Sequence, residues 1–317
     1  MTEHASAAAT SSSGRSHRDE RLGYLLVFLS ALIWSFGGAI ARFLDTDDSW
    51  TVVFWRAFWA ASFLSCFLLW RDGAAGTRAA FRGMGLPGLA VAVCFATAST
   101  SFVVALAHTT VANILLLQAG VPLFAALIAW LVFRERVRFA TWLAIAAVIL
   151  GVAIMVSDAF TGRVSPIGDG LALLIATSLS IATVITRRYS HVGMTPATCL
   201  AALLAALLAL TQATSLAVSA RDMGFLFAFG AVNLGLGLAC FASGARLIPA
   251  AFAALLGTLE TVLAPIWVWL IHGELPSTRT VVGGSVIFTA LLVHIGLEFR
   301  RLRKPARPGA IGMPSPN

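Results

Sequence analysis

The chain has 317 residues, of which 59% are hydrophobic and only 11% are charged, and its mean hydropathy is +0.88. Soluble domains carry about 25% charged residues, so this composition excludes a soluble protein and predicts one that crosses a membrane several times. The net charge of +8 does not indicate nucleic-acid binding, because the basic residues lie in short connectors and not in a patch with interleaved aromatic residues.

The apolar part of the chain lies between two polar ends. Residues 1–21 predict a disordered cytoplasmic tail and not a cleavable signal peptide, and residues 299–317 predict a second cytoplasmic tail. A helix needs about 20 apolar residues to cross a bilayer. Ten segments meet this length, and their uninterrupted apolar runs favour helices over the alternating strands of a membrane barrel. They are residues 22–43, 52–70, 85–106, 111–133, 139–157, 168–186, 197–218, 223–245, 249–271 and 280–298.

The positions of the basic residues predict the orientation. If the N-terminus lies in the cytoplasm, the inner segments hold 17 of the arginine and lysine residues, the outer segments hold 4, and Arg56 lies within a span. The first outer connector instead carries Asp45, Asp47 and Asp48. Because cytoplasmic loops are enriched in basic residues, we predict ten spans with both termini in the cytoplasm.

Two stretches of the chain, 139 residues apart, resemble each other. Ala112–Glu135 aligns without a gap on Ala251–Glu274, and a Trp and the terminal Glu coincide in the two copies. We therefore predict two repeats of five helices, over residues 22–157 and 168–298. Five is an odd number, so the second repeat enters the membrane from the opposite side, as is typical of transporters. The predicted fold class is an all-α membrane protein with ten transmembrane helices in two inverted five-helix repeats.

The repeated stretches carry motifs in the same order. These are Gly120-Val121-Pro122-Leu123-Phe124, Trp130 and Arg134-Glu135-Arg136 in the first copy, and Leu259-Glu260-Thr261, Trp269 and Gly273-Glu274-Leu275 in the second. Their order and doubled spacing resemble the EamA-like family of the drug/metabolite transporter superfamily, over about residues 22–298. Thr261 departs from the Glu-Pro that the family often has, and Pro265 follows one turn later, which displaces any kink by about a turn.

This resemblance implies a secondary transporter in the cytoplasmic membrane of a prokaryote, which moves small metabolites, often outward. It also implies that spans one, three, four, six, eight and nine surround the centre. Glu135 and Glu274 end their helices at the surface, and we interpret them as interfacial pairing residues.

Glu260 is the leading candidate for a functional residue. It lies eleven residues after Pro249, about 16 Å along a helix, and therefore near the middle of a hydrocarbon core of about 30 Å. Charged groups at this depth are costly and are usually paired or functional. Two interpretations stay open: a titratable site whose protonation is coupled to substrate movement, and a carboxyl group that braces two helices.

Two other ionisable residues lie within spans. Arg56 is about five residues from the outer end of the second span, so we expect its side chain to reach the membrane surface by snorkelling. The alternative is that it pairs with Glu260 or with a substrate carboxylate. His294 in the tenth span is either a proton-relay group or a residue that is merely hydrogen-bonded.

Neutral polar and aromatic side chains complete the candidate site. They would line a wet, partly aromatic pocket, or hydrogen-bond between helices, which is their commoner use in membranes. The set is Asn113, Gln118, Ser178, Thr183, Asn233, Thr258, Thr261, Trp34, Phe36 and Phe95.

The motifs of common enzymes are absent from the sequence. It contains no HExxH, GxSxG or P-loop pattern, and its four cysteines have no metal-ligand spacing, so we expect no enzyme, cofactor or metal site.

We predict a proton-coupled or otherwise gradient-driven exporter of amino acids or related amphipathic metabolites, which acts by alternating access. The alternatives are a multidrug efflux carrier and a non-transporting sensor or scaffold. Ala-rich faces such as residues 201–209 permit packing within one chain or in a homo-oligomer.

Overall fold

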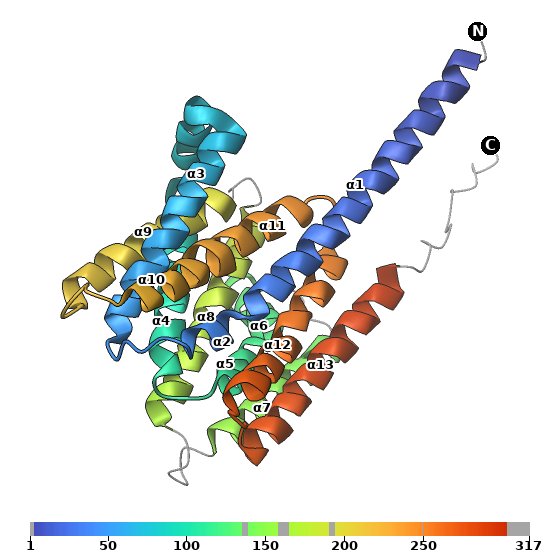
Figure 1. Ribbon diagram of the computed structural model, residues 1–317. Coiled ribbons are helices and arrows are strands. Elements are labelled where there is room, and N and C mark those ends of the chain that lie inside the picture. The colour runs from blue at the N-terminus through green and yellow to red at the C-terminus, as the bar shows by residue number, and fades with distance from the viewer. Residues whose placement is uncertain (1–2, 135–138, 158–164, 190–193, 249, 303–317) are drawn as a thin grey trace.

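The protein is a bundle of helices (Figure 1). The computed structural model describes residues 3–134, 139–157, 165–189, 194–248 and 250–302, and all regular structure in these ranges is helical. The elements are α1 (Glu3–Ser35), α2 (Gly37–Ala41), α3 (Ser49–Gly83), α4 (Gly85–Leu106), α5 (Val111–Gln118), α6 (Val121–Phe133), α7 (Phe139–Val156), α8 (Pro166–Arg188), α9 (Met194–Gln212), α10 (Ala220–Phe227), the π-helical η2 (Ala228–Leu236), α11 (Gly237–Gly244), α12 (Ala250–His272) and α13 (Thr278–Leu302).

The ten predicted segments fall on these helices in order, and three of the segments are divided. The first falls on α1 and α2, the fourth on α5 and α6, and the eighth on α10, η2 and α11. The first helix, α1, begins at Glu3, so the structure differs from the disordered tail predicted for residues 1–21. Within the described ranges, seven helical stretches are long and apolar enough to cross a membrane, or eight if α5 and α6 form one span bent by 42°. Among the described residues, the fifth and ninth segments correspond to shorter apolar helices, Phe139–Met155 and Leu256–His272. The prediction of an all-helical, multi-pass membrane protein is confirmed.

A glycine kink marks the end of the second span. The predicted segment ends at residue 70, whereas α3 continues to Gly83 across a break at Gly73. Gly73 has a φ of 67°, which only glycine adopts readily. The chain therefore changes direction there, and the part of α3 that crosses the bundle is the part before Gly73.

The packing of the helices is symmetric with respect to the two halves. The second, fourth and fifth spans each pack on their counterparts in the other half, which pairs α3 with α9, α5 with α12, and α7 with α13. The third span of each half packs on the first two spans of the other half. In the first half, α4 packs on α8 and α9, and in the second half, α11 packs on α1 and η2 packs on α3. The halves are therefore related as two copies of one unit.

Contacts at one end of the bundle show that the two halves run in opposite directions. The connector after α2 reaches the start of α10, where Asp222 accepts hydrogen bonds from the Asp45 backbone N–H and the Thr46 hydroxyl, both at 3.2 Å. The start of α8 lies at the same end, since a Cβ at Gly168 would meet Thr109 in the α4–α5 connector. The first span of one half thus ends where the first span of the other begins, so the predicted inversion is present.

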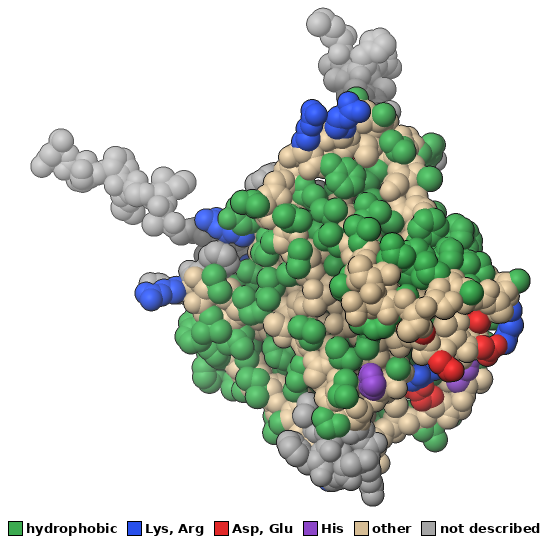
Figure 2. Space-filling view, turned by 90° about the vertical axis from the view of Figure 1, so that its left-hand side faces the viewer, with side chains coloured by type: hydrophobic (Ala, Val, Ile, Leu, Met, Phe, Trp, Pro, Cys, Tyr) green, Lys and Arg blue, Asp and Glu red, His purple; other side chains and the backbone are tan. Residues whose placement is uncertain are grey.

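Charge divides the two ends of the bundle. We name the end just described the acidic end, after its carboxylate side chains Asp45, Asp47, Asp48, Asp169, Asp222 and Glu274. The opposite end, here the arginine end, carries Arg71, Arg78, Arg82, Arg134, Arg187, Arg188 and Arg246. In Figure 2 acidic side chains gather at the lower right and arginines lie toward the top and left, with hydrophobic side chains between them. An apolar band between charged ends is the surface expected of a protein in a bilayer.

Candidate functional site

A cavity of about 280 Å³ lies between the two halves. Eight of the ten predicted segments contribute to its wall, while the described residues of α7 and α13 do not. The lining residues are Trp34, Gly37, Arg56, Leu64, Phe95, Ala98, Ser99, Phe102, Gln118, Ile175, Leu179, Thr198, Ala201, Ala202, Asn233, Leu234, Leu238 and Glu260. Most of the wall is apolar, and its two charged side chains are Arg56 and Glu260.

Arg56 faces this cavity, so the prediction that it snorkels to the membrane surface is wrong. Its side chain is buried, with 7% of the residue exposed. One guanidinium nitrogen, Nη1, donates a hydrogen bond of 2.7 Å to the Ser99 hydroxyl on α4. The guanidinium carbon lies 4.4 Å from the centre of the Phe229 ring and 5.7 Å from that of Phe102. These cation–π contacts stabilise the charge inside the bundle, because the aromatic faces replace part of its hydration.

Glu260 lies across the cavity on α12, in the other half of the molecule. Its charge and that of Arg56 are close enough to attract each other. Among the described residues, however, no hydrogen bond or ion pair within 4.0 Å reaches the Glu260 carboxylate. The two charges thus face one space without closing on each other, which leaves room for a group between them.

Hydrogen-bond donors complete the polar part of the wall. In the described part of the chain, Trp34 Nε1, Arg56 Nε and Gln118 Nε2 are buried and have no hydrogen-bond partner. The bend between α5 and α6 places Gln118 at the last turn of α5, beside the cavity. A glycine makes room for the indole, because a Cβ at Gly237 would overlap Trp34.

Asn233 joins the two discontinuous spans at the cavity. It lies in η2, and its Nδ2 donates hydrogen bonds of 2.6 Å to the Ile33 carbonyl and 3.3 Å to the Trp34 carbonyl. These carbonyls lie just before the break between α1 and α2, where helical hydrogen bonding is interrupted. Gly37 allows the approach, since a Cβ there would lie 3.0 Å from Asn233 Oδ1. Asn233 therefore holds the break in place.

The structure brings together six of the thirteen candidate residues and places seven elsewhere. The six at the cavity are Trp34, Phe95, Gln118, Asn233, Arg56 and Glu260. Phe36 stacks on Trp267 with ring centres 4.9 Å apart, and the Thr183 hydroxyl donates to the Leu179 carbonyl of its own helix. Ser178, Thr258 and Thr261 lie on α8 and α12 outside the cavity lining.

Asn113 lies near the acidic end instead of at the cavity. It is buried, and its Nδ2 donates a hydrogen bond of 2.6 Å to Asp169 at the start of α8. This contact between helices matches the alternative interpretation of the polar residues.

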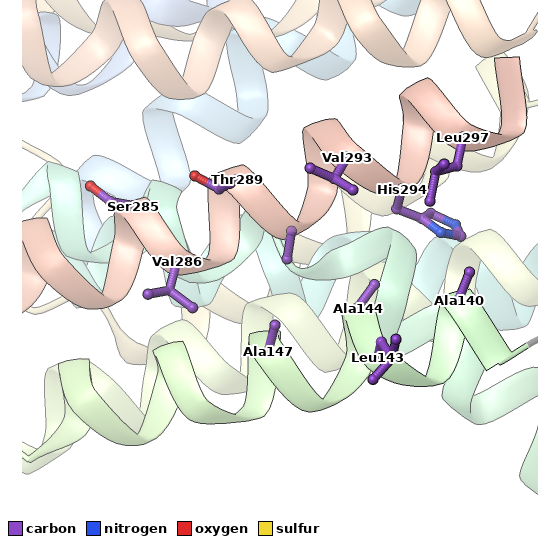
Figure 3. A pocket seen from close by; sticks show the side chains of 11 residues that line it. Ala140, Leu143, Ala144, Ala147, Ser285, Val286, Thr289, Val293, His294 and Leu297 are labelled. Atoms are coloured by element: carbon purple, nitrogen blue, oxygen red, sulfur yellow. The ribbon is translucent and has the colours of Figure 1, made fainter. Parts of the chain in front are cut away.

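His294 lines a separate hollow of about 530 Å³ between α7 and α13. In Figure 3 its ring lies over α7 beside small and aliphatic side chains such as Ala144 and Leu143. This position separates His294 from the central cavity, so the structure does not bring it to Glu260.

The sequence interpretation missed Ser99, Phe102 and Thr198, together with the contribution of α3 and α9. Ser99 belongs to the polar run Thr97–Ser101 inside an apolar helix, which was the available signal. Thr198 had no such signal, because it lies near the start of a helix where polar residues are common.

A polar cluster ties the halves together beyond the cavity. Arg42 Nε donates to Glu274 Oε2 at 2.8 Å, and Glu274 Oε1 accepts from the Val111 backbone N–H at 2.9 Å. The other Arg42 nitrogens donate to the carbonyls of Leu106 and Thr109. Glu274 is thus an interfacial pairing residue, as predicted, whereas Glu135 lies outside the described residues. We name this cluster the Arg42–Glu274 clamp.

Asp48 forms a second link at the acidic end. Its carboxylate accepts hydrogen bonds from the Trp50 N–H, the Thr51 hydroxyl, and both the N–H and the hydroxyl of Thr214, all between 2.9 and 3.2 Å. Burial by itself raises the pKa of this carboxyl, but the four hydrogen bonds outweigh burial and hold the pKa below its usual value.

Two inverted five-helix halves around a central cavity with buried charges define a membrane transporter built from repeats. The chain belongs to the EamA-like transporter family, whose model matches it twice, over residues 21–157 and 166–296. The two matches indicate that the chain consists of two duplicated halves. Family membership makes the protein a membrane transporter and not an enzyme, and it sets aside the non-transporting alternative.

Solved structures share the fold. Fifteen of their chains are similar to this one. One, described as "Crystal structure of protein", has 19% sequence identity and a TM-score of 0.60, and the match covers 89% of this chain and 99% of that chain. At this identity the similarity concerns the fold alone. No curated protein matches the chain.

Proposed function

We propose that the protein is a secondary transporter that exports amino acids or related amphipathic metabolites by alternating access. The observation that carries this proposal is the cavity between the inverted halves, which holds one guanidinium and one carboxylate inside an otherwise apolar wall. Ionisable groups within a membrane are costly and usually serve a substrate or ion pathway. A wall that is mostly apolar with two charges suits a small molecule with the same mixture of properties.

Glu260 is our candidate for coupling or substrate binding. It lies on α12 and faces the cavity, without a hydrogen bond or ion pair to the described residues. A carboxylate that is not committed to a structural contact is available to a proton or to a cationic group of the substrate. We propose that a proton gradient or the gradient of the substrate itself drives transport.

We further propose that the arginine end faces the cytoplasm of a prokaryotic cell, with both termini inside. Basic residues accumulate on the cytoplasmic side of membrane proteins, and the acidic end would then face outward. The proposed unit is one pair of five-helix repeats, over residues 22–157 and 168–298, between two polar tails.

A multidrug efflux carrier is the second candidate. The aromatic side chains Trp34, Phe95 and Phe102 at the cavity favour it, because flat apolar compounds stack on such rings. Arg56 weighs against it for cationic compounds, since a fixed positive charge repels them. Metabolite export is therefore the better-supported function.

The test compares the metabolites that accumulate outside cells expressing the wild type and Glu260→Gln. We expect a few amphipathic metabolites to rise for the wild type and for the control Asp47→Asn, an exposed carboxylate at the acidic end, but not for Glu260→Gln. Equal export by all three proteins would return Glu260 to a structural role. An unchanged medium, with all proteins present in the membrane, would contradict export and direct the same comparison to uptake.

A further inference from the structure

The central cavity holds an arginine whose hydrogen-bonding capacity is mostly unused. A guanidinium has five N–H donors in a fixed plane. In the described part of the chain, Arg56 donates one hydrogen bond to a side chain, from Nη1 to Ser99, and its buried Nε has no partner. Phe229 and Phe102 lie against the guanidinium at 4.4 and 5.7 Å and accept no hydrogen bond in its plane. The edge of the group is therefore left for an acceptor.

Two further side chains of the cavity wall carry a donor in the same condition. Trp34 and Gln118 line the cavity with Arg56, and Trp34 Nε1 and Gln118 Nε2 are buried without a partner among the described residues. An indole N–H is only a donor, so an acceptor must come from elsewhere. Buried donors without a partner are destabilising, and three of them around one cavity suit a ligand with several acceptor atoms.

We propose that Arg56, Trp34 and Gln118 form a carboxylate-binding subsite and that Glu260 binds an ammonium group, so that the substrate is an apolar α-amino acid. This inference rests on the proposed transport function and deepens it. A carboxylate matches the planar fork of arginine with two oxygens, and its remaining lone pairs suit the two neutral donors. Glu260 supplies the opposite charge across the cavity.

The residues of the proposed site come from both halves of the molecule, so a bound substrate contacts both halves at once. Trp34, Arg56 and Gln118 belong to the first half, and Glu260 belongs to the second. An amino acid bound at both subsites links the halves through its own two charges. Its side chain meets the apolar wall, where Leu64, Ile175 and Leu238 favour an aliphatic group and give little to a polar one.

The test uses purified protein with L-leucine and three analogues. Isoamylamine lacks the carboxylate, 4-methylpentanoate lacks the ammonium group, and leucinamide has a neutral amide in place of the carboxylate. Binding is measured as the rise in the thermal unfolding midpoint with ligand concentration, and transport as counterflow in proteoliposomes loaded with leucine. The variants are Arg56→Gln, Arg56→Lys and Trp34→Phe, and the matched control is Arg82→Lys, an exposed arginine near the other end of α3.

We expect leucine to bind the wild type at least about tenfold more tightly than isoamylamine or leucinamide, as charge-assisted hydrogen bonds predict. We expect Arg56→Gln to remove this difference, Trp34→Phe to reduce it, and Arg82→Lys to keep it. Arg56→Lys is expected to recover binding in part, because it keeps the charge without the fork. The wild type should bind leucine more tightly than 4-methylpentanoate, which lacks the ammonium group, and Glu260→Gln should bind the two compounds equally.

Two results separate failure of this inference from failure of the transport function. Counterflow of leucine that is blocked equally by isoamylamine, with no loss in Trp34→Phe or Arg56→Lys, would overturn the carboxylate subsite and leave transport standing. A second result would support the subsite and contradict transport of leucine. In this result there is no counterflow, but leucine and 4-methylpentanoate still raise the unfolding midpoint of the wild type and do not raise that of Trp34→Phe. Unfolding midpoints that no compound raises in the wild type would overturn the subsite.

Discussion

At the scale of single residues, the direction of a side chain decides its role more than its depth in the membrane. Arg56 is near enough to a helix end to snorkel, yet it turns inward to Ser99 and two aromatic rings. The hydrogen bond and the cation–π contacts together replace part of its hydration, which favours the inward orientation. Position along the sequence carries no information about this choice.

Asn233 offers a test of how the break between α1 and α2 is held. Replacing it by alanine removes the side-chain donor to the Ile33 and Trp34 carbonyls, although the Ile33 carbonyl keeps a hydrogen bond of 3.3 Å from the Phe36 backbone N–H. We expect Asn233→Ala to lower the free energy of unfolding by about 1 kcal/mol, as for other interhelical hydrogen bonds in membranes. The measurement is thermal unfolding in detergent. Thr183→Ala is the control, because that hydroxyl donates only within its own helix, and an equal loss in both variants would contradict the role of Asn233.

Asp48 makes the stability of the acidic end depend on pH. Its pKa is lower in the folded protein than in the unfolded chain, so the carboxylate stabilises the fold above the usual Asp value of about 4. This stabilisation is lost as the pH falls through the lowered pKa. We expect Asp48→Asn to melt earlier than the wild type at pH 7 and to lose less on acidification to about pH 3. The exposed neighbour Asp47, changed to Asn, should behave as the wild type does, and identical pH profiles for all three proteins would refute the prediction.

At the scale of elements, interrupted helices surround the cavity. The break after α1, the bend between α5 and α6, and the π-helix η2 all lie in spans that line it. Such interruptions expose backbone groups that a continuous helix would use internally, and they are tolerated where protein or a cavity satisfies them. In transporters, discontinuous spans commonly lie at the binding site.

The Arg42–Glu274 clamp lies one to two turns beyond the cavity toward the acidic end. Gly37 and Phe102 line the cavity, and Arg42 and Leu106 follow them on the same elements. Because the clamp joins the end of α2, the α4–α5 connector and the end of α12, we expect it to limit the opening of the cavity at this end. We expect Glu274→Gln to weaken closure by about 1 kcal/mol, or about fivefold in the ratio of open to closed protein.

The measurement is the rate at which a membrane-impermeant thiol reagent, applied at the acidic end, labels Ala98→Cys in a background without native cysteines. The rate should rise with Glu274→Gln. Arg221→Gln is the control, since its ion pair with Asp45 is exposed and joins the first turn of α10 to the connector between α2 and α3. Equal rates in the wild type and Glu274→Gln would show that the clamp does not limit opening.

At the scale of the whole molecule, the arginines at one end and the carboxylates at the other predict which end faces the cytoplasm. Equivalent ends of the two halves lie on opposite faces, and their connectors nevertheless carry the charges of the face on which they lie. We expect an impermeant thiol reagent added to intact cells to label Asp47→Cys and not Arg78→Cys, both in a cysteine-free background. Labelling of Arg78→Cys alone would reverse the orientation.

The membrane class, the approximate positions of the ten helical segments, the duplication and the family all follow from the order of the residues along the chain. The length of an apolar run, the positions of charges and a repeated motif are local or periodic properties, so they can be recognised from the order of the residues without knowledge of the fold. Only the tertiary structure decided which polar residues meet. Arg56, Gln118 and Glu260 are separated by 62 and 142 residues, and their convergence depends on the helix faces that packing turns inward. For the same reason Thr183 and His294, which are also polar residues within predicted spans, lie away from the cavity.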